Sequence, residues 1–141
     1  MTETPTFVTR EDIEAADRSI DGWIRRTPVM EMEPGAFGVS CPLILKLEQF
    51  QRSGSFKARG AFNLLRNREL PPAGVVAASG GNFGLAIAFA ARALGHHATI
   101  FVPGASSPAK QAKLRALGAE LVVTGRFYAD ALAASKERVA Q

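Results

Sequence analysis

From residue 55 onward, short apolar segments alternate with longer segments of helical periodicity. This alternation constrains the fold most, because strands that are each followed by a helix align in parallel and are covered by those helices. Breaks at Pro71-Pro72, Pro103-Gly104 and Gly118 separate the segments. The sequence therefore predicts an α/β fold, a parallel sheet with flanking helices, made of helix 56–69, strand 75–78, helix 82–94, strand 98–102, helix 107–117, strand 120–124 and helix 127–140.

The first fifty residues have a different pattern. Thr9, followed by the acidic pair Glu11-Asp12, predicts a capped helix that runs to about Ile20. Thr27-Pro28 begins an extended segment. Beyond it we expect a turn or short strand at 35–40 and a strand at 42–47.

A lysine stands at the predicted start of helix 56–69. The residues Gly54 and Ser55 before it are small and let a flat ring approach the backbone. A lysine amine forms a Schiff base with an aldehyde only when neutral, and the positive end of a helix disfavours the ammonium form. Lys57 lies one position before an apolar helix face made of Ala58, Ala61, Phe62 and Leu65. This pattern indicates a reactive amine, but it also suits a solvated lysine on an amphipathic helix.

A second loop connects strand 75–78 to helix 82–94. It contains two glycines, and the helix after it has an apolar face made of Phe83, Ile87, Ala90 and Leu94. A strand, a glycine-rich turn and a helix in this order form an anion site, because unpaired N–H groups point out of the helix start. The same pattern also suits an ordinary turn that needs glycine for its backbone angles.

Together the two loops resemble the pyridoxal-phosphate (PLP) site of the fold-type II enzymes, in particular the serine/threonine dehydratases. The resemblance rests on the stretch from Lys46 to Ala61, with its Lys-x-Glu and Ser-Phe-Lys, and on the Ser-Gly-Gly-Asn loop. It implies that Lys57 is the catalytic Schiff-base residue and that the cofactor is bound by Phe56, Lys57 and Asn82. It further implies that the substrate carboxylate is bound by Ser79, Gly80, Gly81, Asn82 and Phe83.

Two positions depart from the family pattern. Phe83 stands where many members carry histidine, but the backbone N–H is the expected binding group there. Gly80 stands where racemases of the family place a serine as a second acid/base. Elimination needs no such group, so the resemblance implies removal of water from L-serine or L-threonine, which yields a 2-oxo acid and ammonia. A racemase or another β-replacing member of the family is the alternative.

The resemblance covers only the N-terminal part of the family fold. It makes residues 1–50 a segment of a larger domain and residues 51–141 the small domain. The family binds the cofactor phosphate with a run of glycines, whereas the later glycines of this chain are isolated: Gly95, Gly104, Gly118 and Gly125. We therefore expect the 141 residues alone to be inactive. A catalytically silent α/β module that binds an anion or pairs with a partner is the second hypothesis.

A nucleotide-binding Rossmann module is a third hypothesis with less support. The stretch Gly81-x-x-Gly84 contains only part of the dinucleotide motif, and no acidic residue ends the second predicted strand.

The composition also limits the kinds of molecule that this protein is expected to bind. Seventeen basic residues are scattered among thirteen acidic ones without a basic run, which disfavours nucleic acid. No apolar run is long enough for a membrane span, and residues 1–5 do not resemble a signal peptide. The single cysteine, Cys41, excludes an internal disulfide and favours a cytoplasmic protein; we interpret it as a packing residue. His96-His97 has no nearby Cys or carboxylate at ligand spacing, so we predict no metal site.

The expected partners are a small hydroxy-amino acid and further copies of the protein, because apolar surface left exposed favours a homo-oligomer.

Overall fold

The computed structural model describes residues 7–140, so residues 1–5, at which no signal peptide is expected, lie outside it. The elements in chain order are α1 (Arg10–Ile20), β1 (Val29–Glu31), the 3-10 helix η1 (Ala36–Gly38), β2 (Ile44–Lys46), the 3-10 helix η2 (Glu48–Phe50), α2 (Lys57–Arg66), β3 (Val75–Ala78), α3 (Asn82–Ala93), β4 (Ala98–Val102), α4 (Pro108–Ala116), β5 (Glu120–Val123) and α5 (Tyr128–Val139). The predicted alternation is confirmed, with element ends that differ by no more than three residues.

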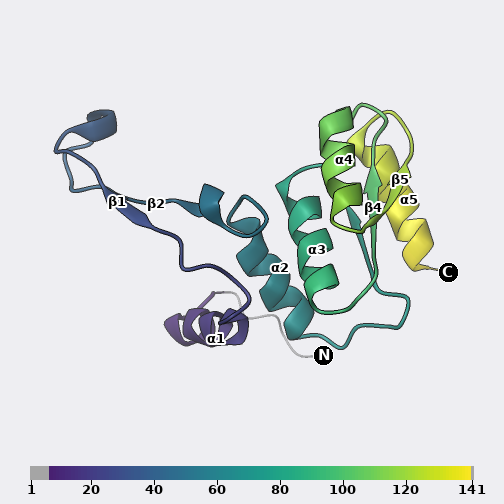
Figure 1. Ribbon diagram of the computed structural model, residues 1–141, viewed down its shortest axis with the longest axis horizontal. Coiled ribbons are helices and arrows are strands. Elements are labelled where there is room, and N and C mark those ends of the chain that lie inside the picture. Colours follow the sequence, from purple (N-terminus) through teal and green to yellow (C-terminus); the bar gives the residue numbers. More distant parts are fainter. Residues whose placement is uncertain (1–6, 141) are drawn as a thin grey trace.

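A three-stranded parallel sheet in the order β3-β4-β5 forms the centre of the α/β domain. Helices α3 and α4 pack on one face of the sheet and α5 packs on the other (Figure 1). The central strand β4 is buried along its whole length, as expected for a strand with neighbours on both edges and both faces. The largest fully buried side chains are Phe62, Ile100, Leu114 and Val102.

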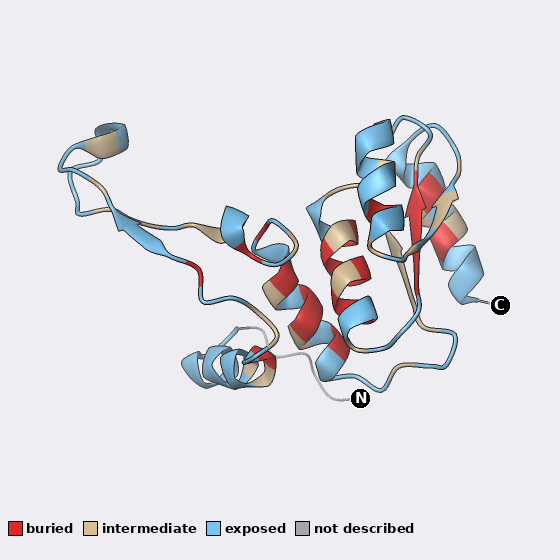
Figure 2. Cartoon of the chain, in the orientation of Figure 1, coloured by how far each residue is buried: buried red, intermediate tan, exposed pale blue. Residues whose placement is uncertain are grey.

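Helix α2 joins the N-terminal segment to this core. Its predicted apolar face is confirmed, because Ala58, Ala61, Phe62 and Leu65 are each no more than 5% exposed and the helix packs against α3 (Figure 2). The Phe62 ring lies 5.6 Å from Trp23 and 6.0 Å from Phe89, between centroids. Helix α1 packs on the other side of α2, and its Ile20 is part of the core. The predicted cap is also confirmed, because Thr9 and Asp12 form a reciprocal capping box.

The antiparallel pair β1–β2 forms an arm that extends away from the rest of the chain (Figure 1). Its residues Val29 and Ile44 are 62% and 60% exposed. The interpretation of Cys41 as a packing residue is wrong, because Cys41 is exposed. It precedes β2 in the loop of this arm, where no other element covers it. The segment 35–40 is a turn with a short 3-10 helix.

The predicted apolar face of α3 is buried at Ile87 and Ala90, but Phe83 in its first turn is 42% exposed. Phe83 lines an open cavity of about 440 Å³ together with Leu64 and Val76. Within residues 7–140, no helix is both long and apolar enough to cross a membrane. The division of the chain at residue 50 stays a prediction.

Candidate active site

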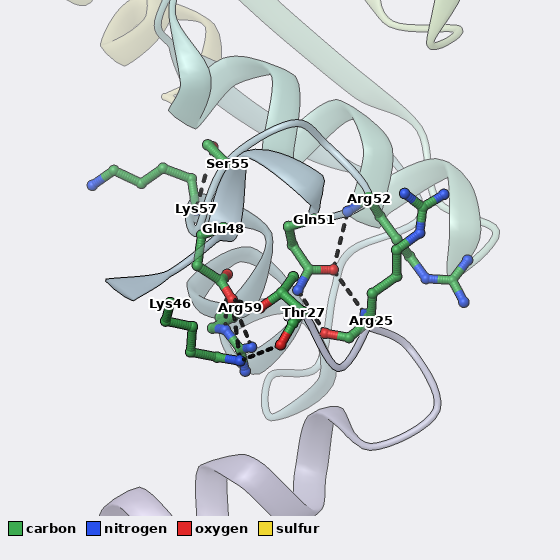
Figure 3. Close-up of polar contacts among 9 residues, drawn as sticks. All are labelled: Arg25, Thr27, Lys46, Glu48, Gln51, Arg52, Ser55, Lys57 and Arg59. Carbon is green, nitrogen blue, oxygen red and sulfur yellow. Dashed lines mark hydrogen bonds and ion pairs between the residues drawn. The ribbon is translucent and has the colours of Figure 1, made fainter. Parts of the chain in front are cut away.

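Lys57 is the first residue of α2, as the sequence predicts. Gly54 before it has a φ of +80°, a left-handed conformation that glycine adopts at little cost, and it turns the chain into the helix. The Lys57 backbone N–H donates to the Oγ of the buried Ser55, at 3.4 Å. The Lys57 amine lies 4.9 Å from the centroid of the exposed Phe56 ring. The Lys57 side chain is exposed and reaches outward from the start of α2 (Figure 3).

A network around Glu48 holds the strand-loop-helix that carries Lys57. The Glu48 carboxylate accepts two hydrogen bonds from the Arg59 guanidinium, at 2.9 and 3.0 Å, and one from the Thr27 hydroxyl, at 2.6 Å. The Lys46 amine donates to the Thr27 carbonyl oxygen, at 3.1 Å. Because Glu48 precedes the Lys57 loop and Arg59 follows it, their ion pair closes the base of that loop. Figure 3 shows the Lys57 side chain pointing away from this network.

Gln51 fastens the same loop to the N-terminal segment. Its amide oxygen accepts from the backbone N–H groups of Arg25 and Arg52, at 2.8 and 3.0 Å, and its amide nitrogen donates to the Arg25 carbonyl, at 2.9 Å (Figure 3). The Gln51 side chain is buried, so each of these bonds replaces water that the amide has lost. The backbone before Lys57 is thereby tied to the distant stretch of chain at Arg25.

The network makes the stability of this region depend on pH. Hydrogen bonding from Arg59 holds the pKa of Glu48 down at about 2, against an ordinary value of 4.5. Because the folded pKa is depressed, the carboxylate stabilises the fold above about pH 4.5, and this stabilisation is lost as the pH falls toward 2. We expect Glu48→Gln to lower the free energy of unfolding at pH 7 by about 1–2 kcal/mol.

Denaturant unfolding at pH 7 and at pH 3 measures this effect. The difference between the wild type and Glu48→Gln should shrink at the lower pH. Glu137→Gln, a change at an exposed position of α5, is the matched control and should leave the unfolding free energy within about 0.5 kcal/mol at both pH values. Equal destabilisation by Glu48→Gln at both pH values would contradict the role of the charge.

The second predicted loop joins the end of β3 to Asn82, the first residue of α3. The Gly81 N–H donates to the Ser79 hydroxyl, at 3.3 Å, and Gly81 itself is extended. Among residues 7–140, no side chain caps the start of α3, so the N–H groups of its first turn are available to an anion. Gly84 is buried against this turn: a Cβ built on it would overlap the Ser79 carbonyl oxygen. The turn and the helix start therefore approach each other as closely as glycine permits.

The two loops lie at the same end of the α2–α3 pair. Both helices begin at the upper end of the view in Figure 1, and the two helices pack against each other. Strand β3 also points to this end, and α3 follows it directly. In open parallel sheets, ligands bind outside the carboxyl ends of the strands, where such loops gather. The arrangement offers an amine on one helix start and free N–H donors with an amide side chain on the other.

Sequence reasoning named these two loops but assigned no function to the residues that hold them. The sequence did contain a signal for Glu48 and Arg59, since the acidic residue of Lys-x-Glu precedes the loop and the arginine follows it inside an amphipathic helix. Their pairing, and the part that Thr27 takes in it, depends on three-dimensional contacts.

The model of the family described as "Pyridoxal-phosphate dependent enzyme" matches residues 20–141. The chain belongs to this family. The matched stretch contains both loops and the network that holds the first of them. The predicted resemblance to fold-type II PLP enzymes is therefore confirmed.

Relatives of this chain include dehydratases and racemases. The L-threonine ammonia-lyase of Geobacter sulfurreducens is 38% identical over 125 residues, which are 87% of this chain and 31% of that protein. The processed form of threonine deaminase isoform 2 from Solanum lycopersicum is 27% identical with a TM-score of 0.79, over 99% of this chain and 43% of that one. Serine racemase from Dictyostelium discoideum is 28% identical with a TM-score of 0.84, over 95% and 44%. The chain spans about a third of the length of the curated relatives it matches.

The residues present fit part of a PLP site. Lys57 offers an outward-reaching amine for the aldehyde, and Asn82 offers an amide at the mouth of the second loop. Gly84 lies so close to Ser79 that the turn has no room for a side chain at position 84. A turn without this side chain can present its backbone N–H donors to a ligand. For the cofactor phosphate, residues 7–140 offer only isolated glycines outside the two loops.

Proposed function

We propose that this chain supplies the lysine and the carboxylate-binding loop of a PLP-dependent enzyme that dehydrates and deaminates L-threonine or L-serine. The proposal rests on the joint placement of Lys57 and the Ser79–Phe83 loop at one end of α2 and α3, in a chain 38% identical to an L-threonine ammonia-lyase. The proposal concerns an enzyme of the length of these relatives, of which this chain matches about a third.

Each group has a role in this proposal. Lys57 would hold the cofactor through its amine until the amine of the substrate replaces it, and the freed Lys57 amine would then take the α-proton of the substrate. The cofactor, when bound, supplies an electron-withdrawing ring next to the substrate α-carbon. The free N–H groups at the start of α3 bind the substrate carboxylate, and the Asn82 amide orients the cofactor ring. Loss of the β-hydroxyl and hydrolysis then yield a 2-oxo acid and ammonia.

Gly80 favours elimination over racemisation. Racemisation needs a proton donor on the face of the substrate opposite to Lys57, and a glycine at this position has no side chain that can serve. Elimination needs one base, which Lys57 provides. The serine racemases among the structural relatives share the fold with this chain. In our proposal, the glycine at position 80 distinguishes this chain from them.

We therefore expect the complete protein, supplied with PLP, to convert L-threonine and L-serine to 2-oxo acids and ammonia. Coupled reduction of the oxo acid measures the product, and chiral chromatography of the same reaction measures D-serine. Accumulation of D-serine with little pyruvate would overturn the assignment to the dehydratases and favour a racemase.

A further inference from the structure

Gly80 of the second loop meets Ser106, which lies between β4 and α4. A Cβ built on Gly80 would lie 2.7 Å from the Ser106 Oγ and 3.6 Å from a methyl carbon of Val102. Real Cβ atoms essentially never approach another heavy atom as closely as the first of these distances, so the Ser106 hydroxyl occupies the space that a side chain at position 80 would need. The structure thus places the Ser106 hydroxyl against the backbone of Gly80.

The backbone of Ser106 is held from two sides. Its N–H donates to the Pro103 carbonyl, at 2.9 Å, and its carbonyl accepts from the Gln111 side-chain amide, at 3.0 Å. The Ser106 hydroxyl itself forms no hydrogen bond with another residue in the described range 7–140, and the side chain is only half-buried. An ordered backbone therefore presents a hydroxyl whose proton is available to a ligand.

The topology brings this hydroxyl to the candidate site. Strands β3 and β4 are parallel neighbours, with Ala78 beside Phe101, so the loops that follow them leave the sheet at the same end. The first of these loops carries Gly80 and the N–H donors of the α3 start. The second carries Ser106.

We propose that Ser106 is a substrate-positioning residue, whose hydroxyl donates a hydrogen bond to the carboxylate of an α-amino acid bound at the Ser79–Phe83 loop. The inference rests on the proposed function and adds to it a residue from a different loop. A hydroxyl is a suitable donor here because an anion held by backbone N–H groups has oxygen lone pairs left to satisfy. Gly80 makes this arrangement possible, because a side chain at position 80 would displace the Ser106 hydroxyl.

The test uses the complete protein loaded with PLP and compares wild type, Ser106→Ala, Gly80→Ala and the double variant. The probes are L-alanine, which has a carboxylate but no leaving group, and ethylamine, which has the amine without the carboxylate. Absorbance titration of the bound cofactor gives the dissociation constant of each. Ser107→Ala is the matched control, because the neighbouring Ser107 is exposed and its side chain does not cap α4.

We expect Ser106→Ala to weaken L-alanine binding about tenfold and to leave ethylamine binding unchanged. With L-threonine as substrate, the change should appear in KM more than in kcat. Gly80→Ala should reproduce the loss, because its Cβ displaces the hydroxyl by rotating the Ser106 side chain. The double variant should then be no weaker than either single variant. Ser107→Ala should match the wild type with both probes.

The results that would contradict this inference differ from those that would contradict the proposed function. Equal weakening of L-alanine and ethylamine in Ser106→Ala, or no weakening of either, would overturn the inference while the dehydratase assignment stands. Additive losses in the double variant would also overturn it, because the two changes would then act through different contacts. A wild-type protein that neither binds L-alanine nor turns over L-threonine would overturn the proposed function, and this inference with it.

Discussion

Replacing Lys57 by alanine should reduce turnover of L-threonine by the complete protein by at least about a thousandfold. In the proposed function, the change removes both the amine that would hold the cofactor and the base that would take the α-proton. It should leave the fold intact, because the Lys57 side chain is exposed and points away from the Glu48 network (Figure 3). Steady-state assay of the 2-oxo acid measures the activity, and thermal melting confirms that the variant is folded.

A chemical label gives an independent measurement for Lys57. Borohydride reduction of the wild-type protein in the presence of PLP should leave a pyridoxyl group on Lys57, located by peptide mapping. Lys110→Ala is the matched control, since Lys110 is an exposed lysine in the first turn of another helix, α4. It should retain full activity and full labelling. A pyridoxyl group on another lysine with Lys57 unmodified would refute the assignment.

Replacing Gly84 by alanine should disrupt the Ser79–Phe83 loop, for which we propose binding of the substrate carboxylate. The new Cβ would overlap the Ser79 carbonyl oxygen and lie 3.0 Å from the carbonyl carbon, and both belong to backbone that cannot rotate away. Either α3 or the loop must shift, at a cost of about 1–3 kcal/mol in unfolding free energy. The shift moves the N–H donors, so we expect KM for L-threonine to rise at least about tenfold.

Gly60→Ala is the control for this prediction. Gly60 lies inside α2, and a Cβ built on it meets nothing within 4 Å. Alanine is about 1 kcal/mol more favourable than glycine inside a helix, so this variant should be as stable as the wild type or more stable. Denaturant unfolding and steady-state kinetics of both variants measure the two effects. A Gly84→Ala protein with wild-type stability and KM would show that the turn tolerates a side chain.

Local patterns in the sequence were enough to predict the elements of the α/β domain. The apolar spacing of Ala58, Ala61, Phe62 and Leu65 correctly predicts the buried face of α2. The predicted breaks at Pro71-Pro72, Pro103-Gly104 and Gly118 all lie between elements. Such signals involve residues only a few positions apart, so they can be recognised without knowing which other elements pack against the helix or strand. The start of α2 at Lys57 and of α3 at Asn82 follows from the same local signals.

The alternation of strands and helices, and the two loops that open into α2 and α3, thus follow from residues close together in the chain. Which residues support these loops depends on how the chain folds back on itself. Glu48 meets Arg59 and Thr27 because the N-terminal segment returns along the Lys57 loop, and Ser106 meets Gly80 because β3 and β4 are neighbours in the sheet. The exposure of Cys41 likewise depends on how the arm stands relative to the rest of the chain. Contacts of this kind join residues that are distant in sequence, and no periodicity or capping signal encodes them.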